Sequence, residues 1–292
     1  MSALRVAVTG SGGQVGSRVV ALLRGLSVPV EIFAVGRARF DVTARDEVHE
    51  FVSALRPDWI INCAAYTAVD RAETEPERAY AANAMAVRWL VEAAERSGSR
   101  VCHFSTDYVF DGSLGRPYRE WDRTNPLGVY GASKLAGEME LRTGLDLCLR
   151  SAWVMSASAG NIAATVGRLA LSRTEMRFVD DQFGSPTSAD DLAAATIRLI
   201  LSSCSGRFHV VNAGAASWLE VARHLAACVG ADPDLVKPAA TAEMRERFPA
   251  PRPVYSVLEP AALAAGGFEP LRDWREALAE SAAQALEAGA WS

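Results

Sequence analysis

The chain has 292 residues, half of them hydrophobic, and a formal net charge of −5. This length allows a large core or two domains, and the mild acidity gives no reason to expect a nucleic acid or a membrane as partner. The five cysteines are scattered, which argues against a disulfide framework or a CxxC metal site. A strand is expected within a few residues of the N-terminus, which leaves no room for a signal peptide. No apolar run approaches the ~20 residues of a membrane span, so we expect a cytoplasmic protein.

Short apolar runs alternate with helical stretches in the first half of the chain. The β-branched run Arg5–Thr9 has no flanking charge pattern and is typical of a strand buried on both faces of a parallel sheet. Helices are expected at 17–26 and 79–96, and further strands at 30–35, 59–63, 101–105 and 145–150. This order predicts an α/β fold, a Rossmann-like doubly wound parallel sheet.

The regular alternation decays from Trp153 onward. Helices are expected at 161–172 and 190–202, a strand at 208–211, further helices from Ser217 and Trp274, and a Pro- and Arg-rich loop at 248–253. We therefore expect residues 1–152, completed by about 181–212, to form the sheet domain. Residues 153–180 and 213–292 are expected to form a smaller C-terminal lobe over the carboxyl ends of the strands, where ligands of such sheets bind.

A glycine-rich turn follows the first strand and precedes the first helix. Backbone N–H groups and the positive end of the helix dipole would meet a pyrophosphate there. The spacing Gly10-x-x-Gly13-x-x-Gly16 is found in extended short-chain dehydrogenases, although a glycine triplet alone is weak evidence. The residues expected to cradle a dinucleotide are Gly10, Gly13, Gln14, Val15 and Gly16.

Two arginines, Arg37 and Arg39, follow the second strand, where an NAD-selective site would usually offer a carboxylate to the adenosine ribose. An arginine there can pair with a 2′-phosphate, which favours NADPH over NADH; the alternative is that both are solvated loop residues. Asp41 could accept from the adenine amino group while Val42 packs on the ring, or Asp41 could simply cap a turn.

The chemistry is indicated by Tyr130 and Lys134, which lie four residues apart and so on one face of a helix. The lysine charge is expected to lower the phenol pKa from about 10 towards neutrality and so make a usable proton donor. The Thr106 hydroxyl, at a strand end, could donate to a substrate carbonyl or bond the phenol, or only cap a turn. Ala64 and Ala65, at another strand end, are small enough to let a cofactor ribose lie close. Tyr-x-x-x-Lys alone is common on surface helices, but with the glycine turn it predicts nicotinamide-dependent carbonyl chemistry.

Several longer motifs occur in one order along the chain: 64–73, 105–110, 130–138, 150–153, 181–187 and 249–253. In that order they resemble the motifs of the dTDP-4-dehydrorhamnose reductase family, within the extended short-chain dehydrogenase/reductase superfamily, over almost the whole chain. The resemblance implies NADPH-dependent reduction of the C4 ketone of a dTDP-4-keto-6-deoxyhexose, first of all dTDP-4-dehydrorhamnose to dTDP-rhamnose.

The resemblance also implies roles for single residues. Tyr130 is the acid, Lys134 positions the nicotinamide ribose and tunes Tyr130, and Thr106 supports the proton transfer. The residues it places at the substrate are Thr67, Val69, Asp107, Tyr108, Trp153 and Arg252. Trp153 could equally be a core aromatic, since large rings usually pack.

One departure concerns magnesium, which members of the family hold with acidic residues at a dimer interface. Arg18 stands where one of those acids would fall, two residues after Gly16, and a cation there disfavours a divalent ion. A homodimer through another surface stays open. None of the four histidines, His49, His103, His209 and His224, has metal-ligand spacing, so we expect no catalytic metal.

Two other functions stay open at this point. One is a sister ketoreductase of a secondary-metabolite deoxysugar pathway, because loop geometry decides which sugar face is attacked. The other is a non-catalytic NADP-binding regulator that resembles the regulatory subunit of methionine adenosyltransferase. The intact set of Thr106, Tyr130 and Lys134 argues against the regulator.

Overall fold

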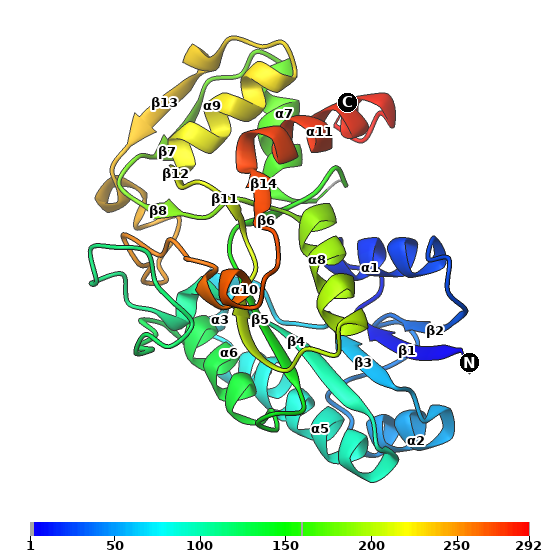
Figure 1. The fold of residues 1–292 in the computed structure, drawn as a ribbon. Helices are drawn as coiled ribbons and strands as arrows, with labels where there is room; N and C mark the ends of the chain where they lie inside the picture. Colours follow the sequence, from blue (N-terminus) through cyan, green and yellow to red (C-terminus); the bar gives the residue numbers. More distant parts are fainter. Residues whose placement is uncertain (1–2, 159, 292) are drawn as a thin grey trace.

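The computed structural model describes residues 3–158 and 160–291, and within them the chain forms a six-stranded sheet (Figure 1). All neighbouring strands are parallel, in the order β10-β5-β4-β3-β1-β2. The strands are β1 Leu4–Thr9, β2 Val30–Val35, β3 Trp59–Asn62, β4 Arg100–Thr106, β5 Leu147–Ser151 and β10 Gly206–His209. The order reverses at β1, because β2 lies on one side of it and β3 on the other, which makes a switch point of the kind where such sheets bind ligands. The expected doubly wound α/β fold is confirmed.

Helices cover both faces of the sheet (Figure 1). Helices α1 Gln14–Arg24 and α8 Ala189–Leu201 pack together on one face, and α2 Arg45–Leu55, α5 Ala86–Ser97 and α6 Val129–Met139 lie on the other. The single helix expected at 79–96 is three segments: α4 Pro76–Tyr80, a π-helical turn η1 Ala81–Met85, and α5. A short helix α3 Val69–Ala72 precedes them. Helix α2 is an element that our sequence expectations did not include.

Apart from α8 and β10, which belong to the sheet and its cover, most of the residues after β5 form a second body of structure with its own core. Its helices are α7 Ile162–Leu171, α9 Trp218–Cys228 and α11 Trp274–Glu287, with 3-10 turns η3 Pro233–Leu235 and η4 Thr241–Met244. Helix α10 Ala261–Ala265 instead lies against β10 and adds Leu263 to the core of the sheet. Its short paired strands are β7 Met176–Val179 with β13 Val236–Ala239, β8 Phe183–Gly184 with β12 Ala216–Ser217, β6 Val154–Met155 with β9 Thr187–Ser188, and β11 Asn212–Ala213 with β14 Leu271–Asp273. The division of the chain at 152, 181 and 212 stays a proposal.

Two strands begin elsewhere than expected. Strand β5 begins at Leu147 rather than at 145, and β10 covers 206–209 rather than 208–211. The pairing register explains both, because Gly206 lies opposite Leu147 and the chain leaves the sheet after His209, opposite Arg150.

The core follows from the parallel sheet, whose central strands are buried on both faces. Val8, Ile61 and Leu149 pack with α1 and α8, and Ile60 and Val101 pack with α2 and α5 on the other face. The second body has a separate cluster around Trp274, Trp291 and Leu225.

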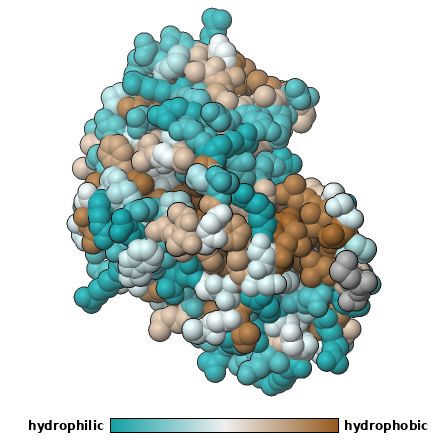
Figure 2. All heavy atoms as spheres, viewed as in Figure 1, coloured by the Kyte–Doolittle hydropathy of each residue, from teal (hydrophilic) through white to brown (hydrophobic). Residues whose placement is uncertain are grey.

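The surface is mostly hydrophilic on the face shown in Figure 2, and apolar side chains gather on the side where α1 lies. Leu22 of α1 and Val28 after it are exposed. None of the helices within 3–158 and 160–291 combines the length and the apolar character that crossing a membrane requires.

Candidate active site

The turn between β1 and α1 forms a cradle of backbone. Gly10 has φ +60°, and a Cβ there would lie 2.6 Å from the backbone of Cys63 and Ala64, so only glycine lets the turn pack against the end of β3. Gly13 is the N-cap of α1, and within the described residues no side chain caps this helix end. The first-turn N–H groups of α1 are therefore suited to an anion, and the turn fits the predicted pyrophosphate cradle.

The segment after β2, which is predicted to contact the adenosine part of the cofactor, shows no geometry that is specific to a nucleotide. Arg37 and Arg39 are exposed. Asp41 Oδ1 accepts hydrogen bonds from Thr43 N (2.9 Å) and Thr43 Oγ1 (2.7 Å), and these bonds, with the charge of Arg37, lower the pKa of Asp41. Asp41 therefore does cap a turn, and its contact with adenine stays a prediction, as does the packing of half-buried Val42 on the ring.

Thr106, at the end of β4, lies beside Tyr130 near the start of α6, and buried Lys134 follows one helical turn later. Tyr130 is the second residue of α6, and its phenol shares a hydrogen bond with the Thr106 hydroxyl. Thr106 also caps the following 3-10 turn η2 Asp107–Val109, since its Oγ1 accepts from Tyr108 N at 3.2 Å. Thr106 Oγ1 donates to Asp107 Oδ1 at 3.0 Å. A hydroxyl has one proton, so Thr106 donates either to Asp107 or to the phenol, and only the bond to the phenol stabilises a phenolate and lowers the Tyr130 pKa.

The protonation of the site is set by burial. Desolvation raises the pKa of Tyr130 to about 12, and the bond from Thr106 opposes this shift. Burial lowers the pKa of Lys134 to about 8. The expected fall of the phenol pKa towards neutrality is therefore wrong for this structure, because the penalty on a buried phenolate outweighs the neighbouring groups. The phenol keeps its proton at neutral pH, which a proton donor requires.

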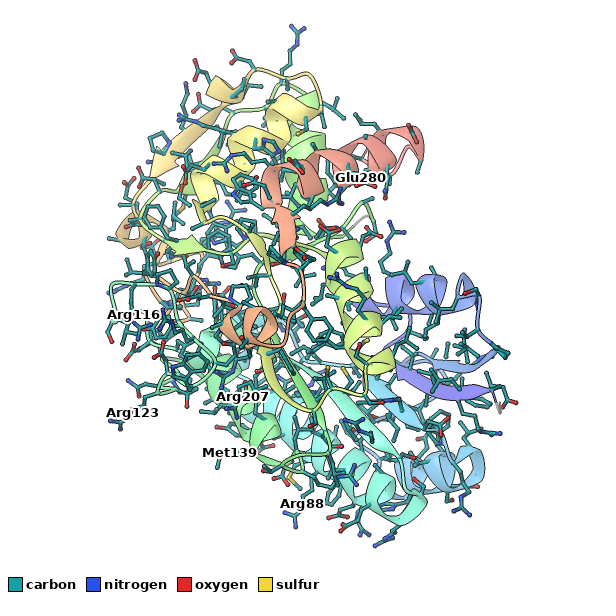
Figure 3. All side chains as sticks on the ribbon, in the orientation of Figure 1. Arg88, Arg116, Arg123, Met139, Arg207 and Glu280 are labelled. Carbon is teal, nitrogen blue, oxygen red and sulfur yellow. The ribbon has the colours of Figure 1, made fainter. Side chains whose placement is uncertain are left out.

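A buried ion pair lies beneath α6. Arg150, which is 1% exposed, donates from Nε (2.8 Å) and Nη2 (2.7 Å) to the two oxygens of Glu138, and Ser105 Oγ donates to the same carboxylate. Arg207 of β10, labelled in Figure 3 near Met139, approaches Glu138 at 3.1 Å. Glu138 lies one turn after Lys134, and its charge partly opposes the fall of the Lys134 pKa. Glu138 and Arg150 belong to the motifs 130–138 and 150–153, but the sequence alone indicated no role for either residue.

The second body contributes residues to the same place. Ser256 Oγ donates to Asp107 Oδ2, and Asp107 is 2% exposed. Arg252 makes two hydrogen bonds to Asp70 (2.9 and 2.7 Å) and one to Tyr108. The ring of Tyr108 lies edge-on to that of Tyr130, with centroids 5.8 Å apart. A small cavity is lined by Val69, Glu73, Tyr108, Leu127, Gly128, Tyr130, Gly131, Pro251 and Pro253. The structure thus brings Asp107, Tyr108, Val69 and Arg252 to the proposed acid; Asp70 and Ser256 were not expected.

The predicted substrate contacts of Trp153 and Thr67 stay predictions. Trp153 has φ 47°, a left-handed conformation that is rare for a large residue, and its ring stacks on Trp218 with centroids 3.9 Å apart. Within the described residues its buried indole N–H has no hydrogen-bond partner. The packing agrees with a core aromatic, while the unsatisfied N–H and the strained backbone agree with a ligand contact, which stays a prediction. Thr67 and Ala65 lie exposed in the loop after β3, and Ala64 is half-buried there.

A magnesium ion does not fit the residues around Arg18. The Arg18 guanidinium pairs with Asp190 at 2.6 Å and donates to Gln284 Oε1 at 2.8 Å, so it already neutralises the nearest carboxylate and links α1, α8 and α11. In the part of the chain that the structure describes, no group of three His, Cys, Asp or Glu side chains could hold a metal.

Comparisons with known proteins identify the family of the chain. The family model described as RmlD substrate binding domain matches residues 4–287. A dTDP-4-dehydrorhamnose reductase from Mycolicibacterium smegmatis is 41% identical, over 98% of this chain and 87% of its own. A dTDP-4-keto-6-deoxy-D-glucose reductase from Streptomyces niveus is 38% identical, over 94% and 96%. The crystal structure of the Bacillus anthracis dTDP-4-dehydrorhamnose reductase in complex with NADP superposes with a TM-score of 0.92 at 34% identity, covering 97% of this chain and 100% of that one. The chain therefore belongs to the RmlD family, that of the dTDP-4-dehydrorhamnose reductases.

Proposed function

We propose that this protein reduces the C4 ketone of a dTDP-4-keto-6-deoxyhexose with NADPH. The observation that carries the proposal is the Tyr130 phenol, hydrogen-bonded to Thr106 and followed one helical turn later by Lys134, beside a glycine cradle that fits a pyrophosphate. The similarity to the two reductases supports the same reading, as does the NADP complex of the B. anthracis relative.

The residues present would divide the work as follows. Gly10, Gly13 and the first turn of α1 would hold the pyrophosphate. Bound NADPH supplies a hydride to the ketone carbon. Tyr130 gives its proton to the ketone oxygen as negative charge grows there, and Thr106 holds the phenol in place. Burial raises the pKa of Tyr130 to about 12 and so disfavours the phenolate that remains. We expect the positive charge of Lys134, one helical turn later, to offset part of this cost once the cofactor is bound.

The finer identity of the sugar rests on the family. dTDP-4-dehydrorhamnose, giving dTDP-rhamnose, is the first candidate because the M. smegmatis relative carries that name. The S. niveus relative keeps another dTDP-4-keto-6-deoxy sugar as the second candidate. A non-catalytic NADP-binding role is disfavoured by the bond between Thr106 and Tyr130.

The test is turnover with defined sugars. The pure protein is incubated with each dTDP-4-keto-6-deoxyhexose and NADPH, oxidation is followed at 340 nm, and the product hexose is assigned by NMR. Tyr130→Phe should remove most turnover and leave NADPH binding near normal. Full turnover in this variant would exclude Tyr130 as the proton donor, and no turnover of any sugar by the wild type would leave the regulatory role.

The cofactor preference rests on the exposed Arg37 and Arg39. We propose that they pair with the 2′-phosphate, so that Arg37→Ala with Arg39→Ala should raise KM for NADPH about tenfold or more and leave KM for NADH unchanged. An equal rise of KM for NADPH and for NADH would show that the arginines do not recognise the 2′-phosphate. A cytoplasmic location and a homodimer stay predictions, which fractionation and light scattering would check.

A further inference from the structure

The start of helix α6, which carries the proposed acid, is capped from outside the helix. Tyr130 is the second residue of α6, and the N-cap position is occupied by Gly128, which has no side chain. The first N–H groups of a helix have no partner within it, and a side-chain oxygen at the N-cap normally accepts from one of them. The group that replaces this cap therefore affects where Tyr130 is held.

A carboxylate from another segment supplies the cap. Glu73 directly follows the short helix α3, and its Oε1 accepts from the N–H of Val129, the first residue of α6, at 2.8 Å. The glycine at 128 makes room for this bond, because a Cβ there would lie 2.5 Å from Glu73 Oε1 and 3.3 Å from Pro251 Cγ. The dipole of α6 also favours a negative charge at this end. Gly128 and Glu73 together thus replace an ordinary N-cap side chain.

The same short helix also holds the second body. Asp70 lies three residues before Glu73, a spacing that puts the two carboxylates on one face of α3. Asp70 accepts from Ala250 N at 3.1 Å and from the Arg252 guanidinium at 2.9 and 2.7 Å. One carboxylate therefore fixes the second-body segment that is expected to hold the substrate, and the other fixes the helix that carries the acid.

The small cavity beside Tyr130 lies where these segments meet. Val69 and Glu73 line it from α3, Tyr130 from α6, and Pro251 from the second body. Its free space is about that of one water molecule. The spacing between α3, α6 and the second body is therefore tight, and a shift of the start of α6 would change the surroundings of the acid.

We propose that Glu73 is a positioning residue for the reduction: by capping α6 from α3, it sets the place of Tyr130 relative to the segment around Arg252. The inference rests on the proposed function. The Tyr130 phenol bonds to Thr106, so Glu73 acts on the acid through the backbone of α6. Reacting atoms have to approach within about 3–3.5 Å, and a displacement of 1 Å costs on the order of 10²-fold in rate.

The first experiment compares Glu73→Ala with a matched control, Asp58→Ala. Asp58 Oδ2 also accepts a backbone N–H from a distant segment, that of Arg5 at 2.8 Å, but it does so at the edge of the sheet opposite the strand carboxyl ends. For each variant we would measure the thermal midpoint, KM for NADPH, and kcat corrected for the folded fraction. The rate ratio between NADPH and NADPH deuterated at the transferred position reports the chemical step.

Positioning and stability have different signatures. We expect Glu73→Ala to lower kcat about tenfold or more, to raise the deuterium isotope effect, and to leave KM for NADPH unchanged, because the cofactor cradle is on another helix. Glu73→Gln keeps an oxygen that accepts from Val129 N and should retain most of kcat. Asp58→Ala should lower only the thermal midpoint. The inference is overturned if Glu73→Ala shows the control's pattern or if Glu73→Gln is as impaired as Glu73→Ala.

A second-site change separates capping from a direct contact with the substrate. Gly128 has an extended backbone, φ −135° and ψ 173°, which suits a serine N-cap, and Glu73→Ala makes room for the Cβ. Gly128→Ser added to Glu73→Ala should therefore restore most of the lost kcat. A serine at 128 that restores nothing would overturn the inference, because the role of Glu73 would then lie elsewhere than in the cap.

Two further measurements keep the inference decidable. Glu73→Asp keeps the charge but is one methylene too short for Val129 N, so it should be impaired as Glu73→Ala is, and it decides the matter if Glu73→Ala does not fold. If the wild type reduces no ketosugar, the proposed function fails. The inference is then decided by amide hydrogen exchange over residues 127–134, which Glu73→Ala must speed and Asp58→Ala must leave unchanged.

Discussion

Asp107 is a buried carboxyl group beside the proposed acid, and its replacement by asparagine should stabilise the protein at pH 7.5. Asp107 is 2% exposed, and desolvation raises its pKa from 3.8 to about 6, although Ser256, Thr106 and backbone N–H groups bond to it. The folded protein therefore holds this proton more firmly than the unfolded chain does. Stability from this group is fully present below pH 3.8 and is lost as the pH rises through about 6.

The size of the effect follows from the shift. A rise from 3.8 to about 6 is roughly two pKa units, and each unit corresponds to about 1.4 kcal/mol. At pH 7.5, ionised Asp107 therefore lowers the free energy of unfolding by up to about 3 kcal/mol. An asparagine has the same shape and remains neutral. Its Oδ1 still accepts from one of the two hydroxyls of Thr106 and Ser256, and its Nδ2 donates to the other once that hydroxyl turns to accept.

The assay is urea unfolding of the wild type and Asp107→Asn between pH 4 and 7.5. The variant should be more stable at pH 7.5 by up to about 3 kcal/mol, and the difference should shrink towards pH 4, where Asp107 is protonated in the folded protein and only about half ionised in the unfolded chain. Asp122→Asn is a control of opposite sign, because the Arg116 guanidinium lowers the pKa of Asp122 to about 2. The reasoning would be refuted if the difference in unfolding free energy between Asp107→Asn and the wild type stayed constant with pH. It would also be refuted if the wild type were more stable than Asp107→Asn at pH 7.5.

Two further predictions concern charges outside the reacting groups. Glu138→Gln leaves the 1% exposed Arg150 without its bidentate partner and should lower the free energy of unfolding by about 3–5 kcal/mol. Glu243→Gln, in a half-exposed pair with Arg177, should leave the free energy of unfolding nearly unchanged. The loss of the Glu138 charge should also lower the Lys134 pKa further, so the limb of the pH–rate profile that reports Lys134 should move to lower pH in Glu138→Gln. Equal losses of stability in Glu138→Gln and Glu243→Gln would contradict this account. Because Arg18 pairs with Asp190, EDTA should leave turnover and particle mass unchanged, and a loss restored by Mg²⁺ would show that a metal acts in this chain after all.

The sheet and the position of the site were predictable because they depend on patterns that are local in sequence. A short apolar run such as 59–62 is typical of a buried strand, and parallel strands place all their carboxyl ends at one edge. Thr106 and the start of α6 therefore had to lie near each other once the strand order was known. The π turn was not predictable in this way, because Ala81-Ala-Asn83-Ala reads as continuous helix and one inserted residue hardly changes the apolar spacing. The signal that was present is a single polar residue within an apolar helical stretch.

The pKa of Tyr130 shows where local reasoning has to fail. The four-residue spacing to Lys134 predicts proximity of the two side chains, but a pKa depends on the balance between charge and desolvation. The desolvation comes from residues far away in the chain, since Pro251 and Pro253 line the same cavity as Tyr130, and Ser256 holds Asp107 from a position 149 residues later. The segment that carries them is tied down by Arg252 on Asp70. The pKa of Tyr130 thus depends on how the second body packs against the sheet, and the sequence of α6 alone does not contain that information.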